Sequence, residues 1–261
     1  MPYTSIHDTR VHYEVDGHGP GLVLVHGTGG DAQMVFGNVV GRFTRDRTVV
    51  RPNFSGSGQT TDDGSDLTVE LISDQVVAAT RAAVQGPVDM LGFSLGAVAA
   101  AAAAATHPDL VRRLVLVGGW PHSGGARDRF YFETWRKLLD TDRELFKRFS
   151  TLTGFSAATL DLFGHDGLAR TLTNDWPPPG IGRQIDLSAR VDIRGLLPKI
   201  TAPTLVIGLG ADSMVSMEAS RQLAGAIPGA RLVEIDDEGH MDWFGDPTGL
   251  VKLARDFLDA D

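Results

Sequence analysis

The sequence predicts an α/β fold with a mostly parallel central sheet flanked by helices. Short β-branched runs alternate with longer segments whose apolar residues recur at helical spacing. One run, Pro87 to Leu91, leads directly into a Gly-Phe-Ser-Leu-Gly motif and an alanine-rich segment. The interval 120–199 contains amphipathic segments but no strand-like run. This pattern predicts a single core, built from residues 1–119 and 200–261, with a helical insertion at 120–199.

The expected elements follow one another along the chain. Strands are expected at 10–15, 21–26, 47–51, 87–91, 114–117, 202–207 and 231–235. Helices are expected at 68–84, over the alanine tract 97–105, near 127–149 and 157–172, and at 216–226 and 247–258. The alanine tract is too short to span a bilayer, so it is interpreted as a buried helix packed closely on the sheet.

Composition excludes several classes of protein. The chain has 261 residues and a net charge of -9, which disfavours binding to nucleic acid or to anionic membranes. It has no cysteine, so disulfides, thiolate metal sites and cysteine nucleophiles are excluded. No metal or organic cofactor is indicated. The amino terminus shows no secretory signal, so a cytoplasmic location is expected. The expected partner is a small-molecule substrate, and the sequence is compatible with a homodimer.

The motif Gly92-Phe93-Ser94-Leu95-Gly96 lies between an expected strand and an expected helix. A nucleophilic serine at such a junction occupies a sharp, strained turn, and small residues on both sides leave room for it. Gly92 and Gly96 meet that need, so Ser94 is the candidate nucleophile. The alternative is a glycine-rich turn in which the serine only caps the helix.

A serine hydroxyl needs a base, and the base needs a carboxylate that holds it in one tautomer. His240 follows the last expected strand and a glycine, and Asp212 follows the preceding strand. Serine, acid and histidine thus come in the chain order expected when the nucleophile sits at a strand-to-helix elbow. Asp236, Asp237 and Asp242 are nearby acids that compete with Asp212 for this role, and they can also be interpreted as solvated loop charges.

Acyl transfer also needs backbone N–H groups that stabilise the oxyanion. The N–H of Leu95, directly after the candidate nucleophile, is one expected donor. The loop His26-Gly27-Thr28-Gly29-Gly30 follows the first parallel strand, and the N–H of Thr28 is the expected second donor. A phosphate-binding loop is the alternative, but the segment lacks the lysine of a P-loop and the spacing of a dinucleotide motif.

Five segments together resemble the α/β-hydrolase superfamily over nearly the full chain. They are HGTGG at 26–30, PNFSGSGQT at 52–60, GFSLG at 92–96, PTLVIGLGADSMV at 203–215 and EGHMDWF at 238–244. The resemblance implies an α/β-hydrolase fold with Ser94 as nucleophile, Asp212 as acid and His240 as base. It also implies a helical cap over 120–199, inserted after the sixth strand. Serine hydrolases of the esterase and lactonase kind are the branch that this pattern resembles.

The resemblance also carries one exclusion and one departure. A serine at position 94 excludes the dehalogenase and epoxide-hydrolase branches, which are associated with an aspartate nucleophile. At 51–58 many relatives have an acidic residue before a glycine-rich turn, whereas this chain has Arg51 and Pro52. That loop is expected to border the site only indirectly.

Aromatic and thioether side chains are frequent in the insertion and around the elbow. The candidate substrate-binding residues are Phe93, Trp120, Trp135, Met214 and Met241. Amphipathic cap helices bury one face, so only about a third of these large apolar side chains are expected to reach a pocket. An apolar acyl or ring substrate is therefore expected.

The expected function is hydrolysis of a carboxylic ester, lactone or thioester of a largely apolar small molecule through an acyl-serine intermediate. Two alternatives stay open. The same fold and triad can serve carbon-carbon bond hydrolysis, perhydrolysis or cyclisation in secondary metabolism. The fold can also serve as a non-catalytic binding module for a small molecule.

Overall fold

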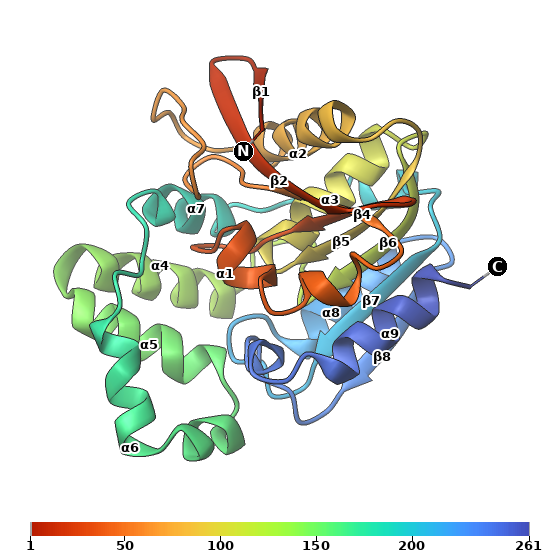
Figure 1. Ribbon diagram of the computed structural model, residues 1–261. Coiled ribbons are helices and arrows are strands. Elements are labelled where there is room, and N and C mark those ends of the chain that lie inside the picture. The colour runs from red at the N-terminus through yellow and green to blue at the C-terminus, as the bar shows by residue number, and fades with distance from the viewer. Residues whose placement is uncertain (1, 261) are drawn as a thin grey trace.

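The computed structural model describes residues 2–260 and confirms the predicted α/β architecture. An eight-stranded sheet in the order β1-β2-β4-β3-β5-β6-β7-β8 runs through the centre of the molecule (Figure 1). β1 and β2 pair antiparallel, as do β2 and β4, and all other neighbours are parallel. The strands are β1 (Tyr3–Ile6), β2 (Thr9–Gly17), β3 (Gly21–Val25), β4 (Thr48–Pro52), β5 (Val88–Phe93), β6 (Val111–Val117), β7 (Thr204–Leu209) and β8 (Arg231–Ile235).

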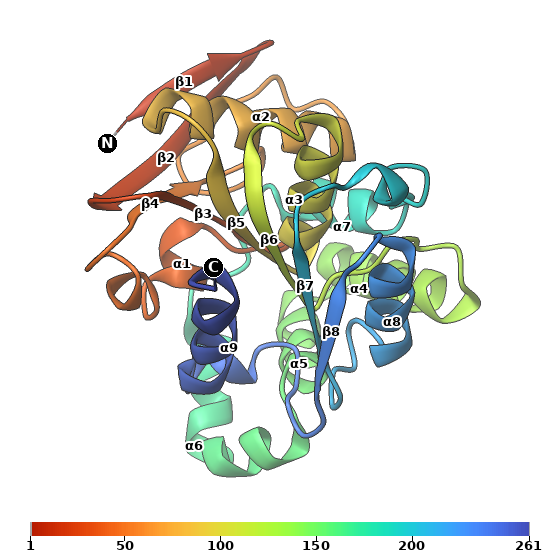
Figure 2. The same ribbon diagram turned by 90° about the vertical axis from the view of Figure 1, so that its right-hand side faces the viewer.

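Helices cover both faces of the sheet (Figure 2). α1 (Ala32–Phe36) and α9 (Thr248–Leu258) lie on one face, and α2 (Val69–Ala83), α3 (Leu95–Thr106) and α8 (Met217–Ala226) lie on the other. Successive side chains of a strand point to opposite faces, so each parallel strand contributes to two apolar layers. In β3, Leu22 and Leu24 belong to the layer under α1 and α9, and Val23 and Val25 belong to the layer under α2 and α3.

α3 is the alanine-rich helix that the sequence predicts to be buried. Its residues Ala97–Ala105 are all buried, because small side chains let the helix lie close to the sheet. The helix ends at Thr106, with His107 as its C-cap residue. No helix within residues 2–260 combines the length and the apolar character needed to cross a membrane.

Four helices separate β6 from β7 and lie beside the carboxyl ends of the parallel strands (Figure 1). They are α4 (Ala126–Thr141), α5 (Arg143–Gly154), α6 (Ala157–Thr173) and α7 (Ile181–Ser188). This is the interval in which the sequence predicts a helical insertion. We call residues 120–199 the cap, and that they form a separate domain stays a prediction. Short 3-10 turns complete the chain at Val40–Arg42, Leu197–Lys199 and Asp242–Phe244.

Three details differ from the sequence-based expectation. The segment near 127–149 is helical as expected, but it consists of two helices, because α4 ends at Thr141 and α5 begins at Arg143. Asp142 separates them in an extended conformation, and its side chain caps α5 by accepting the N–H of Leu145 at 2.9 Å. The short elements β1, α1 and α7 were not predicted from the sequence. α6 has a kink at Gly164, whose φ is +60°.

Candidate active site

Ser94 occupies the sharp turn between β5 and α3. Its φ of +56° and ψ of -124° lie in a backbone region that residues other than glycine rarely adopt. The turn is possible because both flanking positions lack a side chain. A Cβ atom on Gly92 would overlap the carbonyl oxygen of Gly96, and a Cβ atom on Gly96 would overlap the carbonyl oxygen of Val25. The alternative of an ordinary helix cap fails, since the Ser94 side chain accepts no capping hydrogen bond.

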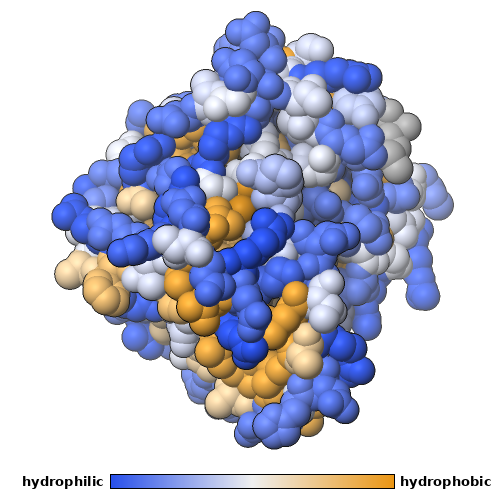
Figure 3. All heavy atoms as spheres, turned by 90° about the vertical axis from the view of Figure 1, so that its left-hand side faces the viewer, coloured by the Kyte–Doolittle hydropathy of each residue, from blue (hydrophilic) through white to orange (hydrophobic). Residues whose placement is uncertain are grey.

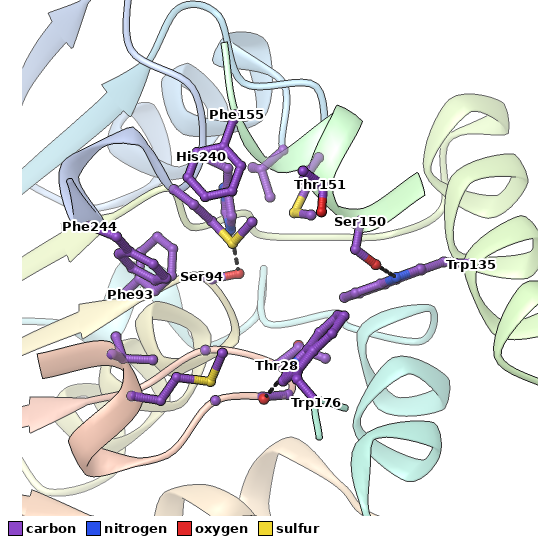
Figure 4. A pocket seen from close by; sticks show the side chains of 18 of the residues that line it. Thr28, Phe93, Ser94, Trp135, Ser150, Thr151, Phe155, Trp176, His240 and Phe244 are labelled. Atoms are coloured by element: carbon purple, nitrogen blue, oxygen red, sulfur yellow. Dashed lines mark hydrogen bonds between the residues drawn. The ribbon is translucent and has the colours of Figure 1, made fainter. Parts of the chain in front are cut away.

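The Ser94 hydroxyl faces His240, and His240 in turn faces Asp212. Nε2 of His240 lies 2.9 Å from Oγ of Ser94, and Nδ1 lies 2.5 Å from Oδ2 of Asp212. Figure 4 shows the first of these two contacts. All three residues are buried, with 7%, 3% and 8% of their surface exposed in that order. A continuous hydrogen-bonded path therefore joins the hydroxyl to the carboxylate.

Asp212 is held rigidly at the end of β7. Its Oδ1 accepts the backbone N–H groups of Met214 at 2.7 Å and Val215 at 2.8 Å, which leaves Oδ2 for the imidazole. The competing acids Asp236 and Asp237 are exposed and make no contact with His240. Asp212 is thus the carboxylate that the fold brings to the histidine.

The loop that carries His240 is tied to the cap. Oδ2 of Asp242 accepts the N–H of Gly239 at 2.8 Å, and Oδ1 accepts the N–H of Ser156 at 3.0 Å. The N–H of Met241 donates to the carbonyl of Gly154 at 2.7 Å. The interpretation of Asp242 as a solvated loop charge is therefore wrong, because its carboxylate connects the histidine loop to the start of α6.

The two expected oxyanion donors lie next to Ser94. Leu95 is the first residue of α3, where backbone N–H groups lack partners within the helix. Gly27 brings the β3 loop against Ser94, since a Cβ atom on Gly27 would lie 2.8 Å from Cβ of Ser94. Across residues 2–260, neither the N–H of Thr28 nor that of Leu95 donates a hydrogen bond. Both groups are free for a substrate oxygen.

Ser94 and His240 open onto a cavity of about 220 Å³ between the core and the cap (Figure 4). All five candidate substrate-binding residues line it. Further apolar lining comes from Tyr131, Phe132, Phe155, Trp176 and Phe244. More large apolar side chains reach the cavity than the expected third, because α4 contributes Tyr131, Phe132 and Trp135 to its lining.

Apolar surface continues from the cavity to the outside. Met34 lines the cavity and is also 51% exposed. Hydrophobic side chains gather in a band across the cap side of the molecule, between hydrophilic borders (Figure 3). The exposed large apolar residues of α5 and α6 are Leu145, Leu152 and Leu162. An apolar molecule that approaches from this side meets a compatible surface.

The cavity also has a small polar part that the sequence analysis missed. Lys147, Ser150 and Thr151 line it from one face of α5, at the spacing of a helical stripe. The ammonium group of Lys147 is buried and donates to the carbonyl oxygens of Leu172, at 2.9 Å, and Asn174. It forms no ion pair within the described chain. The 3- and 4-residue spacing along α5 is a signal that could have identified this stripe.

Tyr131 is the only tyrosine that lines the cavity among the described residues. Burial raises the pKa of its hydroxyl above the ordinary value. That hydroxyl lies 3.2 Å from Oγ1 of Thr153, whose own proton is donated to the carbonyl of Phe149 at 2.8 Å. Tyr131 is therefore neutral and donates to Thr153, so it contributes packing rather than a second base.

His26 precedes the glycine-rich loop and is wholly buried. Burial lowers its pKa to about 4, so the ring is neutral. The ring stacks on Phe54 with a centroid distance of 4.0 Å, and Nδ1 lies 2.9 Å from the carbonyl oxygen of Gly27. His26 thus supports the loop from behind. In the described part of the chain, no group of three or more histidine or acidic side chains is arranged to hold a metal ion.

Comparison with known proteins decides the family. A family model for the alpha/beta hydrolase fold matches residues 20–247. The chain belongs to this family. A pyrrolizixenacetamide deacetylase of Xenorhabdus hominickii is 41% identical to this α/β hydrolase over 263 residues, covering 99% of this chain and 98% of the relative. A pimeloyl-[acyl-carrier protein] methyl ester esterase of Xanthomonas oryzae pv. oryzae is 31% identical, covering 95% of this chain and 98% of the relative.

Solved structures agree with this assignment. The enol-lactonase of Burkholderia xenovorans LB400 superimposes with a TM-score of 0.86 at 24% identity, covering 99% of this chain and all of that one. Its likeness supports the fold, and the relatives above support the enzyme class. This α/β hydrolase is an enzyme of the hydrolase class, as the sequence predicts.

Proposed function

We propose that this α/β hydrolase cleaves a carboxylic ester, lactone or thioester of a largely apolar small molecule through an acyl-serine intermediate. The observation that carries the proposal is the hydrogen-bonded path from Ser94 through His240 to Asp212, which opens into an apolar cavity. Such a path supplies a nucleophile, a base and a group that holds the base in one tautomer. The buried setting excludes most water from the reacting groups.

In the first half of the proposed reaction, Oγ of Ser94 attacks the substrate carbonyl carbon while Nε2 of His240 takes the hydroxyl proton. Asp212 accepts the hydrogen bond of Nδ1–H and stabilises the imidazolium. The carbonyl oxygen becomes negative and is stabilised by the N–H groups of Thr28 and Leu95. Collapse of this intermediate breaks the bond to the leaving group, which receives the proton from His240.

In the second half, a water molecule gives its proton to His240 and attacks the acyl carbon. The ester bond to Ser94 breaks, the serine oxygen regains the proton from His240, and the carboxylic acid departs. Each proton transfer of the proposal runs between Ser94, His240 and the substrate or water, so the proposed reaction needs no cofactor.

Amide hydrolysis is a second candidate, and one specific observation favours it. The relative that is 41% identical over almost the whole chain is named a pyrrolizixenacetamide deacetylase. The same acyl-serine route serves an amide if His240 protonates the leaving nitrogen. A short acyl group, such as acetyl, suits a cavity of about 220 Å³ that must also hold the rest of the substrate.

Matched substrates test the proposal. Acetate, butyrate and octanoate esters of one apolar alcohol, together with the acetamide of the corresponding amine, are offered to the wild type and to Ser94→Ala. We expect ester turnover by the wild type, and a loss of at least about 1,000-fold in the variant. Turnover of the acetamide within about 100-fold of the acetate would support the deacetylase candidate. Equal turnover by Ser94→Ala would contradict an acyl-serine route.

A further inference from the structure

The cap contributes a buried amide side chain to the loop that carries one proposed oxyanion donor. Gln184 on α7 is fully buried, and its Oε1 accepts the N–H of Gly29 at 2.7 Å. Its Nε2 donates to the carbonyl of Ser55 at 3.0 Å and to the hydroxyl of Ser57 at 2.9 Å. One side chain therefore joins α7, the 27–30 turn and the 51–58 loop.

Two further cap residues hold the same turn. Nε1 of Trp176 donates to the carbonyl of Gly29 at 2.8 Å, so both backbone groups of Gly29 are bonded to the cap. Oγ of Ser188 lies 3.1 Å from Oγ1 of Thr28 and donates to the backbone carbonyl of Gln184 at 2.8 Å. Since Ser188 uses its own proton for Gln184, the hydroxyl of Thr28 is the donor to Ser188. Three cap residues, Gln184, Trp176 and Ser188, therefore form hydrogen bonds with Thr28 or Gly29.

The shape of the turn explains why this matters. The N–H of Gly30 donates to the carbonyl of Gly27 at 3.3 Å, and Gly29 has a φ of +72°. Positive φ at this position is typical of a type II turn, and a type I turn differs from it by rotating the central peptide through roughly half a turn. That central peptide joins Thr28 to Gly29. Because its N–H is held by Gln184, the side chain stabilises one of the two orientations.

The hydrogen bond of the Gly29 N–H also indicates which N–H of the turn can bind an oxyanion. The N–H of Gly29 is directed at Gln184 and is not free for substrate, whereas the N–H of Thr28 has no acceptor in the described chain. We propose that Gln184 is a positioning residue: by holding the Thr28–Gly29 peptide it fixes the 27–30 turn, and with it the adjoining Gly27–Thr28 peptide, whose N–H points at the substrate oxyanion. This inference rests on the proposed acyl-serine mechanism and adds that the cap, not only the core, sets the oxyanion geometry.

Close backbone packing supports the same role. A Cβ atom on Gly180, just before α7, would overlap Cα of Gly56 in the 51–58 loop. The start of α7 therefore sits directly on that loop, which leaves Gln184 little freedom to move. The loop itself does not line the cavity, and it acts on the site indirectly, because Ser55 and Ser57 hold the amide that binds the turn.

The chain offers a matched control for a purely structural role. Gln75 on α2 is also fully buried, and it bonds the same Ser55, accepting its N–H at 2.8 Å and donating to its hydroxyl at 2.8 Å. It makes no hydrogen bond to the 27–30 turn. Gln75→Met and Gln184→Met therefore remove comparable buried hydrogen bonds from one loop, and only the second releases Gly29.

The experiment compares these two variants with the wild type in the full chain. Measurements are kcat and KM for an ester that the wild type turns over, the melting temperature, and the infrared carbonyl stretch of a ¹³C-labelled acyl group trapped on Ser94. We expect Gln184→Met to lower kcat by about 10- to 100-fold, with KM changed by less than about threefold, since loss of a whole oxyanion donor costs about 100- to 1,000-fold. The carbonyl stretch should move to higher frequency, because its hydrogen bond weakens.

A conservative variant of Gln184 distinguishes a positioning role from a general loss of stability. Gln184→Glu keeps the acceptor for Gly29 but loses the donors to Ser55 and Ser57, so its kcat should exceed that of Gln184→Met. Gln75→Met should lose a comparable amount of melting temperature while keeping kcat and the carbonyl frequency. If Gln184→Met does not fold, Ser188→Ala, which releases the Thr28 hydroxyl and removes one donor from the carbonyl of Gln184, should still lower kcat and shift the stretch.

Two results would overturn the inference. One is an unchanged kcat and carbonyl frequency in folded Gln184→Met. The other is an equal loss of kcat in both glutamine variants. Failure of the proposed function is recognised separately, because the wild type itself would then form no acyl-enzyme, and the inference would fall with it.

Discussion

The carboxylate of Asp242 accepts the backbone N–H of Ser156 across 86 residues of chain, at 3.0 Å. Its other oxygen accepts the N–H of Gly239, the residue before His240. The histidine loop and the start of α6 therefore share one anchor. The base of the proposed mechanism depends on the cap for its position, just as the 27–30 turn does.

Replacing this anchor should weaken both stability and activity. Asp242→Ala leaves two backbone N–H groups without their acceptor, so we expect a loss of about 1–3 kcal/mol in the free energy of unfolding. A looser His240 should also lower kcat, by about tenfold. Urea denaturation and steady-state kinetics measure the two effects. Wild-type stability in the variant would show that water replaces the carboxylate without penalty.

Replacing Asp212 should reduce activity strongly but change stability little. Asp212→Asn is nearly the same size and can still accept the N–H groups of Met214 and Val215, so stability should change little. Activity should fall by about 1,000- to 10,000-fold, because an amide no longer stabilises the required imidazole tautomer. Asp236→Asn, at an exposed position on the next loop, is the matched control and should keep full activity. Similar kinetics for the two variants would argue against Asp212 as the orienting acid.

Buried neutral His26 should make the fold sensitive to acid. The unfolded chain protonates this histidine near pH 6.5, whereas the folded protein does so only near pH 4. Between these values the unfolded state binds more protons, so stability is full above pH 6.5 and falls as the pH drops toward 4. The two pKa values correspond to a total loss of about 3 kcal/mol.

The variant His26→Phe tests this titration directly. Phenylalanine can keep the stacking on Phe54 but binds no proton, so the variant should lose less stability than the wild type between pH 6.5 and 4. The free energy of unfolding is measured by urea denaturation at several pH values. Equal pH dependence in both proteins would mean that His26 is not the titrating group.

The sequence predicts the core well because its signals are local. The β-branched runs and the glycines around Ser94 each determine their own element, and the structure has those elements within a few residues. Ser94, Asp212 and His240 meet because each follows a parallel strand, and the carboxyl ends of such strands share one edge of the sheet.

The cap was predicted less well because its decisive contacts are not local. α7 is short and contains a glycine, so its pattern is weak, and Gln184 reaches a glycine that lies 155 residues away in the chain. The break at Asp142 did have a local signal, an aspartate three residues before the N–H that it caps. For the buried Lys147 the only sequence signal was its helical spacing from Ser150 and Thr151, and a lysine on the protein surface can have the same spacing.

The most direct test of the central claim is labelling with a fluorophosphonate probe, followed by intact mass and by mapping of the modified peptide. The wild type and a folded Ser94→Ala variant, matched in melting temperature, are treated in parallel. The mechanism predicts one adduct on wild-type Ser94 and none on the variant. An unlabelled wild type, or equal labelling of the variant, would contradict the assignment of Ser94 as an activated nucleophile.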